Sequence, residues 1–280
     1  MFLPIGIDEF IQNSLKEDIP NQDITTKIIV NEESVSKAVL IAKEEMVIAG
    51  LDIFQRVFHI LNNDISVEIH YTEGSCVKKG DTILELKGNT HALLSGERVA
   101  LNLLQRMCGI ASLTKKFVDA IQNTNCRIAD TRKTTPGLRS LEKYAVTIGG
   151  GINHRYSLSD AILIKENHIK AGGGIETTLK KVIKEKPHLM SFEIEVESID
   201  ELKTAIKYGA KNIMLDNFSP KSCKEAVEIC QDKNITLETS GNISLENVRS
   251  YAETGVNIIS VGKLTHSAPA SDISLLIKEL

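Results

Sequence analysis

The stretch SFEIEVESIDELKTAIKYGAKNIMLDN, residues 191–217, decides the fold. It contains an apolar run at Ser191–Ile194 that leads into Glu195. A second apolar run, at Lys211–Leu215, leads into Asp216. Both runs have the length and composition of buried β-strands. Each of the two predicted strands therefore ends in a carboxylate.

A helix is predicted between these two strands. Ser198 and Glu201 have the spacing of a capping box, in which two side chains bind the first unpaired backbone N–H groups of a helix. The helix continues to Tyr208 and stops at Gly209, the residue type that most often ends helices. A strand, a helix and a second strand are typical of a parallel sheet.

The same pattern recurs through the second half of the chain. Four more apolar runs end in a charged residue, a hydroxyl or a glycine: Cys126–Asp130 before Arg132, Ala161–Ile164 before Lys165, Ile235–Glu238 before Ser240, and Val256–Val261 before Gly262. We predict an α/β fold, and specifically an open or incomplete α/β barrel, because six strands are visible where the common barrel has eight. The C-terminal strand ends of such a barrel carry the active site, so the residues that follow the strands are the candidates.

Two domains are predicted. Residues 1–110 form an N-terminal α+β sandwich domain, and residues 111–269 form the α/β barrel domain. One or two buried helices over residues 91–124 are expected to join them. The C-terminal residues 270–280 are expected to return to the first domain.

The N-terminal domain shows mixed local patterns. Asp8–Glu17 has the spacing of a short amphipathic helix. The apolar runs Ala38–Ala42 and Met46–Ala49 are separated by Lys-Glu-Glu, as in a hairpin. Residues 73–88 read as strand, turn and strand, with Gly-Asp at the turn.

The charge distribution favours a pocket for a small anion. The net charge is −4, but residues 127–170 hold eight Lys/Arg against four Asp/Glu, so this block carries +4 and the remainder −8. A nucleic-acid-binding protein is usually basic over a wide face, whereas a local cationic patch on an acidic body suits a focused pocket. We therefore expect no nucleic-acid partner.

Other bulk features predict a cytoplasmic protein. No apolar stretch is long enough to cross a bilayer, and the start MFLPIGIDEF lacks the features of a secretory signal. The five cysteines form no Cys-x-x-Cys pair, and their odd number is typical of reduced thiols. We expect no membrane partner.

Residues 130–139, DTRKTTPGLR, closely resemble the signature of type II phosphoribosyltransferases, above all the quinolinate phosphoribosyltransferase family. The resemblance continues in GERVALNLLQRMCGIA (96–111), GGGINHR (149–155), LIKENHI (163–169), EIEVES (193–198), IMLDNFSP (213–220), ETSGNIS (238–244) and ISVGKLTHSAPASDIS (259–274). One departure is Asn242, where the family often has a second glycine. Asn tolerates left-handed backbone conformations better than most residues.

The resemblance implies a reaction and a set of ligands. The family joins quinolinate to 5-phosphoribosyl 1-pyrophosphate, and it yields nicotinate mononucleotide, pyrophosphate and carbon dioxide with Mg2+ as cofactor. Quinolinate is a planar dicarboxylate, and such groups select Arg over Lys. The resemblance assigns quinolinate to Arg132, His154 and Arg155. It also implies a homodimer, or a higher oligomer, in which the partner subunit contributes Arg98.

The remaining candidate residues follow from the same resemblance. Lys133 and Lys165 are placed toward the phosphates and the pyrophosphate. Glu195 and Asp216 meet the ribose hydroxyls and Mg2+, directly or through water or substrate, and they stabilise the positive charge that develops at the anomeric carbon. The turns after the last two strands are expected to bind the 5′-phosphate through Ser240, Gly241, Asn242, Val261 and Gly262.

Alternatives remain open at this point. A phosphoribosyltransferase-like protein of molybdenum transport operons shares the DTRKT block and would act on another acceptor. Arg98 and the Asn-His-Arg triplet at 153–155 favour quinolinate over that acceptor. A non-catalytic binding protein on the same scaffold is disfavoured because Glu195 and Asp216 are both present. His168, Asn167, His266 and Glu193 are either substrate contacts or structural residues.

Overall fold

The computed structural model describes residues 3–278, which form two compact units. The first unit comprises the chain up to Leu113, Ser140–Gly149 and the chain from Ser267 onward, and the second comprises Thr114–Arg139 and Gly150–His266. The boundary at Leu113 falls inside one continuous helix, α4 (Thr90–Ala120). The segment 140–149, which carries most of α5 (Arg139–Ile148), therefore belongs to the first unit although the chain on both sides of it belongs to the second.

The second unit is built on a six-stranded sheet in which neighbouring strands are all parallel. Its strands are β6 (Arg127–Ala129), β7 (Ile162–Ile164), β8 (Phe192–Val196), β9 (Asn212–Asp216), β10 (Thr236–Ser240) and β11 (Ile258–Ser260). The order across the sheet is β6-β11-β10-β9-β8-β7, and in the described chain the edge strands β6 and β7 do not pair with each other. The predicted open α/β barrel is confirmed.

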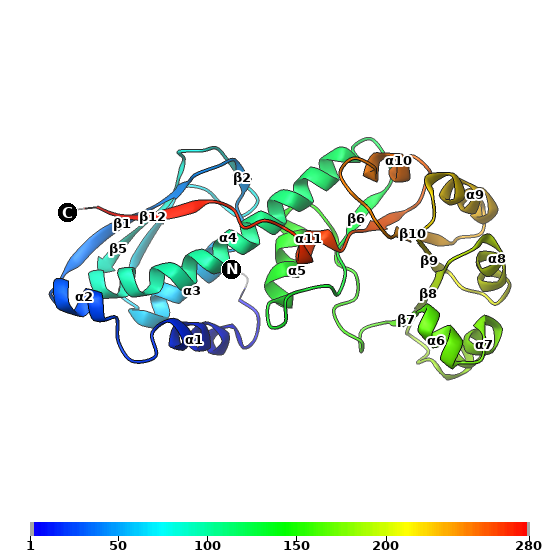
Figure 1. Cartoon of the computed structure of the whole chain (residues 1–280), viewed down its shortest axis with the longest axis horizontal. Helices are drawn as coiled ribbons and strands as arrows, with labels where there is room; N and C mark the ends of the chain where they lie inside the picture. The colour runs from blue at the N-terminus through cyan, green and yellow to red at the C-terminus, as the bar shows by residue number, and fades with distance from the viewer. Residues whose placement is uncertain (1–2, 279–280) are drawn as a thin grey trace. The chain divides into compact units, whose positions relative to one another are not determined.

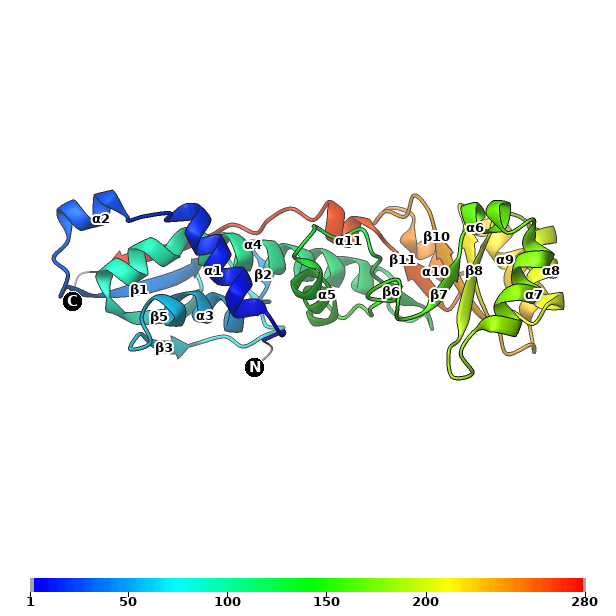
Figure 2. The same ribbon diagram turned by 90° about the horizontal axis from the view of Figure 1, so that it is seen from below.

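Helices connect these strands and lie on the outside of the curved sheet (Figures 1 and 2). They are α6 (Glu166–Ala171), α7 (Ile175–Glu185), α8 (Ile199–Lys207), α9 (Pro220–Cys230) and α10 (Val248–Ala252), and the short α11 (Lys263–His266) follows the last strand, β11. Helix α8 begins as predicted, because the Ser198 hydroxyl accepts a hydrogen bond from the Glu201 N–H. It ends before Gly209, which has the left-handed φ of 82° that a helix stop requires.

The strands present polar side chains to the inside of the barrel. On β8, Phe192, Ile194 and Val196 are buried against the helices, so the alternating residues Glu193 and Glu195 face inward. The register then aligns polar residues of neighbouring strands. Residue 195 lies beside Met214, Met214 beside Glu238, and Asp216 beside Ser240. Glu195 and Glu238 thus lie at the level of Met214, and Asp216 and Ser240 lie two residues further toward the C-terminal ends of their strands.

The first unit contains a four-stranded antiparallel sheet in the order β12-β1-β5-β3. Its strands are β1 (Val35–Ala42), β3 (Ser66–Ile69), β5 (Thr82–Asn89) and β12 (Ile273–Lys278), and a separate pair joins β2 (Met46–Val47) to β4 (Cys76–Val77). Helices α1 (Ile7–Asp18), α2 (Ile24–Ile29) and α3 (Leu51–Leu61) complete it with the first part of α4. Strand β12 brings the C-terminal segment back to β1.

One local prediction for this unit is wrong, and another is confirmed. Strand β1 does not form a hairpin with β2, because its two edges pair with β5 and β12 while β2 pairs with β4. The strand, turn and strand predicted in residues 73–88 are present, as β4, a turn that contains Gly80 and Asp81, and β5, although β5 joins the large sheet and β4 joins β2. In both cases a partner distant in the sequence replaces the local one. Among the described residues, no helix is long and apolar enough to cross a membrane.

Candidate active site

A cavity of about 590 Å³ opens at the C-terminal ends of the strands of the second unit. It is lined by Thr131, Arg132, Lys133, His154, Arg155, Leu163, Lys165, Glu195, Met214, Asp216, Asn217, Glu238, Ser240, Gly241, Asn242 and Ser260. Ten of the residues named from the sequence are in this set, and they come from separate parts of the chain. The cavity therefore combines a group of cations with two carboxylates and a turn after β10.

Two arginines form the cationic wall of this cavity. The Nε atoms of Arg132 and Arg155 are both buried and have no hydrogen-bond partner. Burial, and next the positive charge of Arg132, lower the pKa of Arg155. A buried guanidinium donor without an acceptor is costly, and a carboxylate oxygen is the acceptor that fits its fork best. The pair is therefore suited to bind an anion with planar oxygen pairs.

A buried carboxylate positions the loop that carries Arg155. Asp130, which is fully buried, accepts a hydrogen bond of 2.8 Å from the His154 N–H. The backbone of Ile152 pairs with that of Ala129 and Asp130, which adds this loop to the edge of β6. Arg155 then donates from Nη1 to the Ala161 carbonyl at 2.9 Å. These bonds hold the loop beside the strand end that leads to Arg132.

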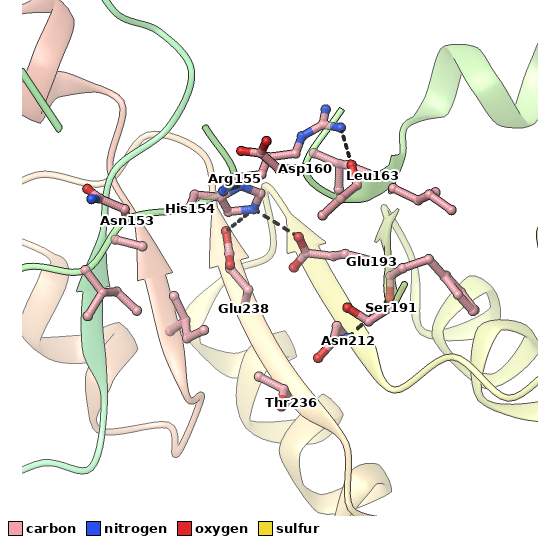
Figure 3. Close-up of a pocket in the computed structure, with 16 residues that line it drawn as sticks. Asn153, His154, Arg155, Asp160, Leu163, Ser191, Glu193, Asn212, Thr236 and Glu238 are labelled. Atoms are coloured by element: carbon pink, nitrogen blue, oxygen red, sulfur yellow. Dashed lines mark hydrogen bonds and ion pairs between the residues drawn. The ribbon is translucent and has the colours of Figure 1, made fainter. Parts of the chain in front are cut away.

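His154 lines the cavity, and both of its ring nitrogens bind within the protein. Nδ1 accepts a hydrogen bond of 2.8 Å from the Arg155 N–H, so Nδ1 carries no proton. The proton is on Nε2, which donates to Glu193 Oε2 at 3.0 Å. Figure 3 shows this ring between two carboxylates, those of Glu193 and Glu238, which come from β8 and β10. His154 is therefore a neutral imidazole held by its neighbours.

The two lysines are positioned differently. Lys165 extends from the end of β7, and its Nζ forms an ion pair with Glu195 at 2.5 Å. Lys133 is fixed through its backbone, because its N–H donates to the Thr131 hydroxyl and its carbonyl accepts from Thr265. Its side chain passes over Gly262, where a Cβ would lie 3.0 Å from Lys133 Cδ. Because Gly262 has no side chain, the Lys133 side chain can extend past it into the cavity.

The carboxylates of Glu195 and Asp216 border a second acidic space. A cavity of about 150 Å³ is lined by both of them and by Glu166, Glu197 and Glu201, with Ile169 and Lys170. The charge of Glu166, then burial and the charges of Glu201 and Asp216, raise the pKa of Glu197. Negative charge accumulates here, which a bound cation would relieve.

The turn after β10 contains left-handed backbone conformations, which glycine and asparagine adopt more readily than other residues. Gly241 has φ 105°, and a Cβ on it would lie 2.1 Å from Asn217 Oδ1. Asn242 follows with φ 52°, in the left-handed region. Asn217 itself has φ 56° and lines the cavity beside this turn. The asparagine at 242 therefore satisfies the conformation that a glycine would also adopt there.

Three of the residues named from the sequence are not in the lining set. Arg98 belongs to the first unit, where its side chain is 58% exposed on α4 and its nearest acidic partner is Glu97 at 3.8 Å. Val261 is buried, and its N–H donates to the Ala129 carbonyl at 2.9 Å. This backbone donor is therefore used within the sheet. Gly262 lies under Lys133 and beside the His266 ring.

His168 has a structural contact. Its Nδ1 accepts a hydrogen bond of 2.9 Å from the Lys165 N–H at the start of α6. This contact supports the strand end that presents Lys165.

Sequence reasoning missed two polar residues inside the cavity. Glu238 is only 3% exposed, and its Oε1 atom has no hydrogen-bond partner. Ser260 is similarly buried at the end of β11. Strand alternation could have found Glu238, because it is two residues before Ser240 and so shares its inward face.

A further cavity of about 380 Å³ lies on the other side of His154 (Figure 3). It shares His154, Arg155, Leu163 and Glu238 with the larger cavity. Its other lining residues include Glu193, Asn212 and Thr236 from the lower parts of their strands. The imidazole and its two carboxylates therefore stand between the two spaces.

Known proteins resemble this chain over nearly its whole length. The family model of the quinolinate phosphoribosyl transferase N-terminal domain matches residues 23–108, and that of the C-terminal domain matches residues 110–276. A probable nicotinate-nucleotide pyrophosphorylase [carboxylating] of Bacillus subtilis is 43% identical, over 97% of this chain and 93% of its own length. A mitochondrial quinolinate phosphoribosyltransferase [decarboxylating] of Nicotiana glauca is 39% identical, over 97% of this chain and 82% of its own length.

Solved structures agree with these matches. The crystal structure of NadC from Streptococcus pyogenes has a TM-score of 0.94 and 38% identity, and the match covers 100% of this chain and 99% of that one. The nicotinate-nucleotide pyrophosphorylase from Francisella tularensis has a TM-score of 0.93 and 40% identity, covering 99% and 98% of the two chains. The cavity geometry, both domain models and these relatives lead to one conclusion: the chain belongs to the quinolinate phosphoribosyl transferase family.

Proposed function

We propose that this protein transfers the phosphoribosyl group of 5-phosphoribosyl 1-pyrophosphate to quinolinate. The products are nicotinate mononucleotide, pyrophosphate and carbon dioxide, in a step of NAD biosynthesis. The observation that carries the proposal is the convergence of two arginines with unpartnered buried Nε atoms, two lysines and two strand-end carboxylates on one cavity. The family match disfavours the relative from molybdenum transport operons.

In this proposal quinolinate lies against Arg132 and Arg155. Its ring carboxylates supply the acceptors that the two Nε atoms lack. Binding an anion also offsets the repulsion between the two guanidinium groups, which contributes to the lowered pKa of Arg155. His154 is a positioning residue: its ring donates a hydrogen bond to Glu193, and its backbone N–H donates one to Asp130.

The phosphoribosyl donor lies on the opposite side of the cavity. Lys133 and Lys165 attract its phosphates, and the Ser240–Gly241–Asn242 turn offers backbone N–H groups to the 5′-phosphate. Gly262, beneath Lys133, belongs to the same phosphate region. The donor phosphates would compete with Glu195 for the Lys165 ammonium group.

Glu195 and Asp216 would hold Mg2+, directly or through water or substrate. Oxygen ligands from carboxylates suit this ion, which usually keeps several waters and bridges to phosphates. The acidic space around Glu197 fits a cation on the same side. When bound, Mg2+ neutralises the leaving pyrophosphate. The two carboxylates also face the anomeric carbon, where positive charge develops as the pyrophosphate departs.

We further propose that the protein is a cytoplasmic homodimer, or a higher oligomer, in which Arg98 completes the quinolinate pocket of the partner. Arg98 is exposed, and its weak contact with Glu97 leaves it able to bind another acceptor. The large apolar residues Ile24, Ile28 and Ile29 are exposed on α2, as expected of a surface that another subunit covers. The five cysteines are all free, which fits a reducing compartment.

The proposal is tested with purified protein, quinolinate, 5-phosphoribosyl 1-pyrophosphate and Mg2+. Release of nicotinate mononucleotide, followed by chromatography, is the expected result. Nicotinate and other pyridine carboxylates are the matched acceptors, and they are expected to turn over far more slowly. No product from quinolinate, together with turnover of another acid, would assign the protein to a sibling activity.

A further inference from the structure

The carboxylate–histidine cluster (His154, Glu193 and Glu238) forms the boundary between the two barrel cavities. His154 Nε2 lies 3.0 Å from Glu193 Oε2 and 3.8 Å from Glu238 Oε1 (Figure 3). Glu238 is 3% exposed, and its Oε1 has no hydrogen-bond partner. Two carboxylates thus face one imidazole in a buried site, and one of them is incompletely bonded.

The hydrogen bonds of His154 show how many protons its imidazole ring carries. Nδ1 accepts from the Arg155 N–H, so the ring has one proton, on Nε2, and is neutral. A neutral imidazole cannot offset the charges of two carboxylates. Two carboxylates within 4.8 Å of each other, of which Glu238 is buried and Glu193 partly buried, do not both ionise readily, because each charge opposes the other. The cluster therefore retains a proton on one carboxyl group.

A metal ion is a poor explanation of this cluster. A histidine that binds metal through Nε2 usually donates its Nδ1 proton to a carbonyl or a carboxylate. Here Nδ1 faces a backbone N–H and can only accept. Metal on Nε2 would leave the ring without any proton, so the bonding pattern favours a proton over a metal between the ring and the acids.

Glu238 is the carboxyl group that holds the proton. Burial, followed by the charge of Glu193, raises the pKa of Glu238 to about 7. The Ser260 hydrogen bond acts in the opposite direction, as a charged imidazole at His154 would, and Glu195 adds a smaller rise. Glu193 accepts the Nε2–H bond, whereas Glu238 Oε1 has no hydrogen-bond partner. These groups come from β8, β11 and the loop before β7, the elements around Glu238.

The reaction needs one proton at a defined atom, and this need rests on the proposed function. After the pyridine nitrogen has bonded to the anomeric carbon, the bond from C2 to its carboxylate breaks. Carbon dioxide leaves, and the electron pair remains on C2. C2 gains a proton as this bond breaks, which gives nicotinate mononucleotide.

We propose that Glu238 is the acid that protonates C2 as the carboxylate leaves. The O–H bond of the Glu238 carboxyl breaks, its proton bonds to C2, and Glu238 becomes a carboxylate. Water in the 380 Å³ cavity returns the proton, because Glu238 borders that space as well as the substrate cavity. His154 and Glu193 position the donor, since the Nε2–H bond fixes the ring and the Glu193 carboxylate beside it.

The test separates the two halves of the reaction in a single turnover. Glu238→Gln keeps the shape of the side chain and removes its acidic proton. We expect pyrophosphate release at close to the wild-type rate, CO2 release slowed by about 100-fold or more, and accumulation of an adduct that retains both carboxylates. Quinolinate labelled in the 2-carboxylate and rapid quenching measure these steps. Glu225→Gln, the same change at an exposed position of α9, should alter neither.

A second measurement uses only the wild-type protein and so does not depend on the variant folding. The acid form donates, so the single-turnover rate of CO2 release should fall as pH rises above about 7, while pyrophosphate release changes less. In D2O, CO2 release should slow more than pyrophosphate release. A CO2 rate that is constant from about pH 6 to 9, or equal slowing of both steps in Glu238→Gln, would overturn the inference. Failure of the wild-type protein to form nicotinate mononucleotide would instead refute the proposed function.

Discussion

Replacement of Arg132 by alanine is the cleanest test of the quinolinate pocket. The Arg132 Nε is buried without a partner, so its removal breaks no hydrogen bond of that atom within the protein. Arg155, by contrast, also bonds to the Ala161 carbonyl and supports its loop. The loss of affinity in Arg132→Ala should therefore report ligand contacts rather than damage to the fold.

The expected magnitude follows from the type of contact. A hydrogen bond to a charged group contributes about 1.5–3 kcal/mol, so losing one weakens quinolinate binding by about 10- to 150-fold. The donor phosphates face Lys133, Lys165 and the 240–242 turn, so affinity for 5-phosphoribosyl 1-pyrophosphate should change by less than about fivefold. Removing Arg132 also removes its charge repulsion with Arg155. The loss of quinolinate affinity should therefore be somewhat smaller than for an arginine with no second arginine beside it.

Titration calorimetry with each ligand separately measures both losses. Arg132→Lys keeps the charge but not the planar fork, and it should recover only part of the affinity. Arg127→Ala changes an exposed arginine at the first residue of β6, the strand that leads to Arg132, and should leave both affinities unchanged. Equal weakening of both ligands in Arg132→Ala would refute the assignment of this wall to quinolinate.

Three further predictions follow from other parts of the site. Gly241→Ala places a Cβ against Asn217 at a residue with φ 105°, so it should lower the free energy of unfolding measured in urea by about 1–3 kcal/mol. It should also raise the KM for the phosphoribosyl donor. An unchanged KM would show that this turn does not bind the donor phosphate. Glu195→Gln and Asp216→Asn should each lower kcat by about 100- to 1,000-fold and raise the Mg2+ concentration needed for half-maximal rate; a variant with unaltered Mg2+ dependence would count against that residue as a ligand. Arg98→Ala and Arg155→Ala proteins should each be inactive and regain partial activity when mixed, because a mixed dimer contains one intact site, and formation of mixed dimers without any regain would contradict the shared site.

The barrel was predictable from the sequence because its signals are local. Each strand is a short apolar run, and Ser198 and Gly209 mark the ends of the helix between two of them. The pairing of β1 was not predictable in this way. Its partner β12 comes from the other end of the chain, and no turn residue in the region after Ala42 reveals that partner.

The site was predictable to the extent that its residues end strands. Lys165, Glu195 and Asp216 reach one cavity because parallel strands end at the same edge of a sheet. Glu238 was missed because it lies inside the strand rather than after it, and only its inward orientation and burial give it a role. The hydrogen bond from the Val261 N–H to the Ala129 carbonyl could not be predicted from the sequence either, because it depends on the register between β6 and β11.

The most direct test of the central claim is a crystal structure of the protein with nicotinate mononucleotide bound. The product is expected to lie in the cavity of about 590 Å³. Its pyridine carboxylate should contact Arg132 or Arg155, and its phosphate should contact the turn at Gly241. A product molecule bound elsewhere, or one whose phosphate lies on the two arginines, would contradict the account.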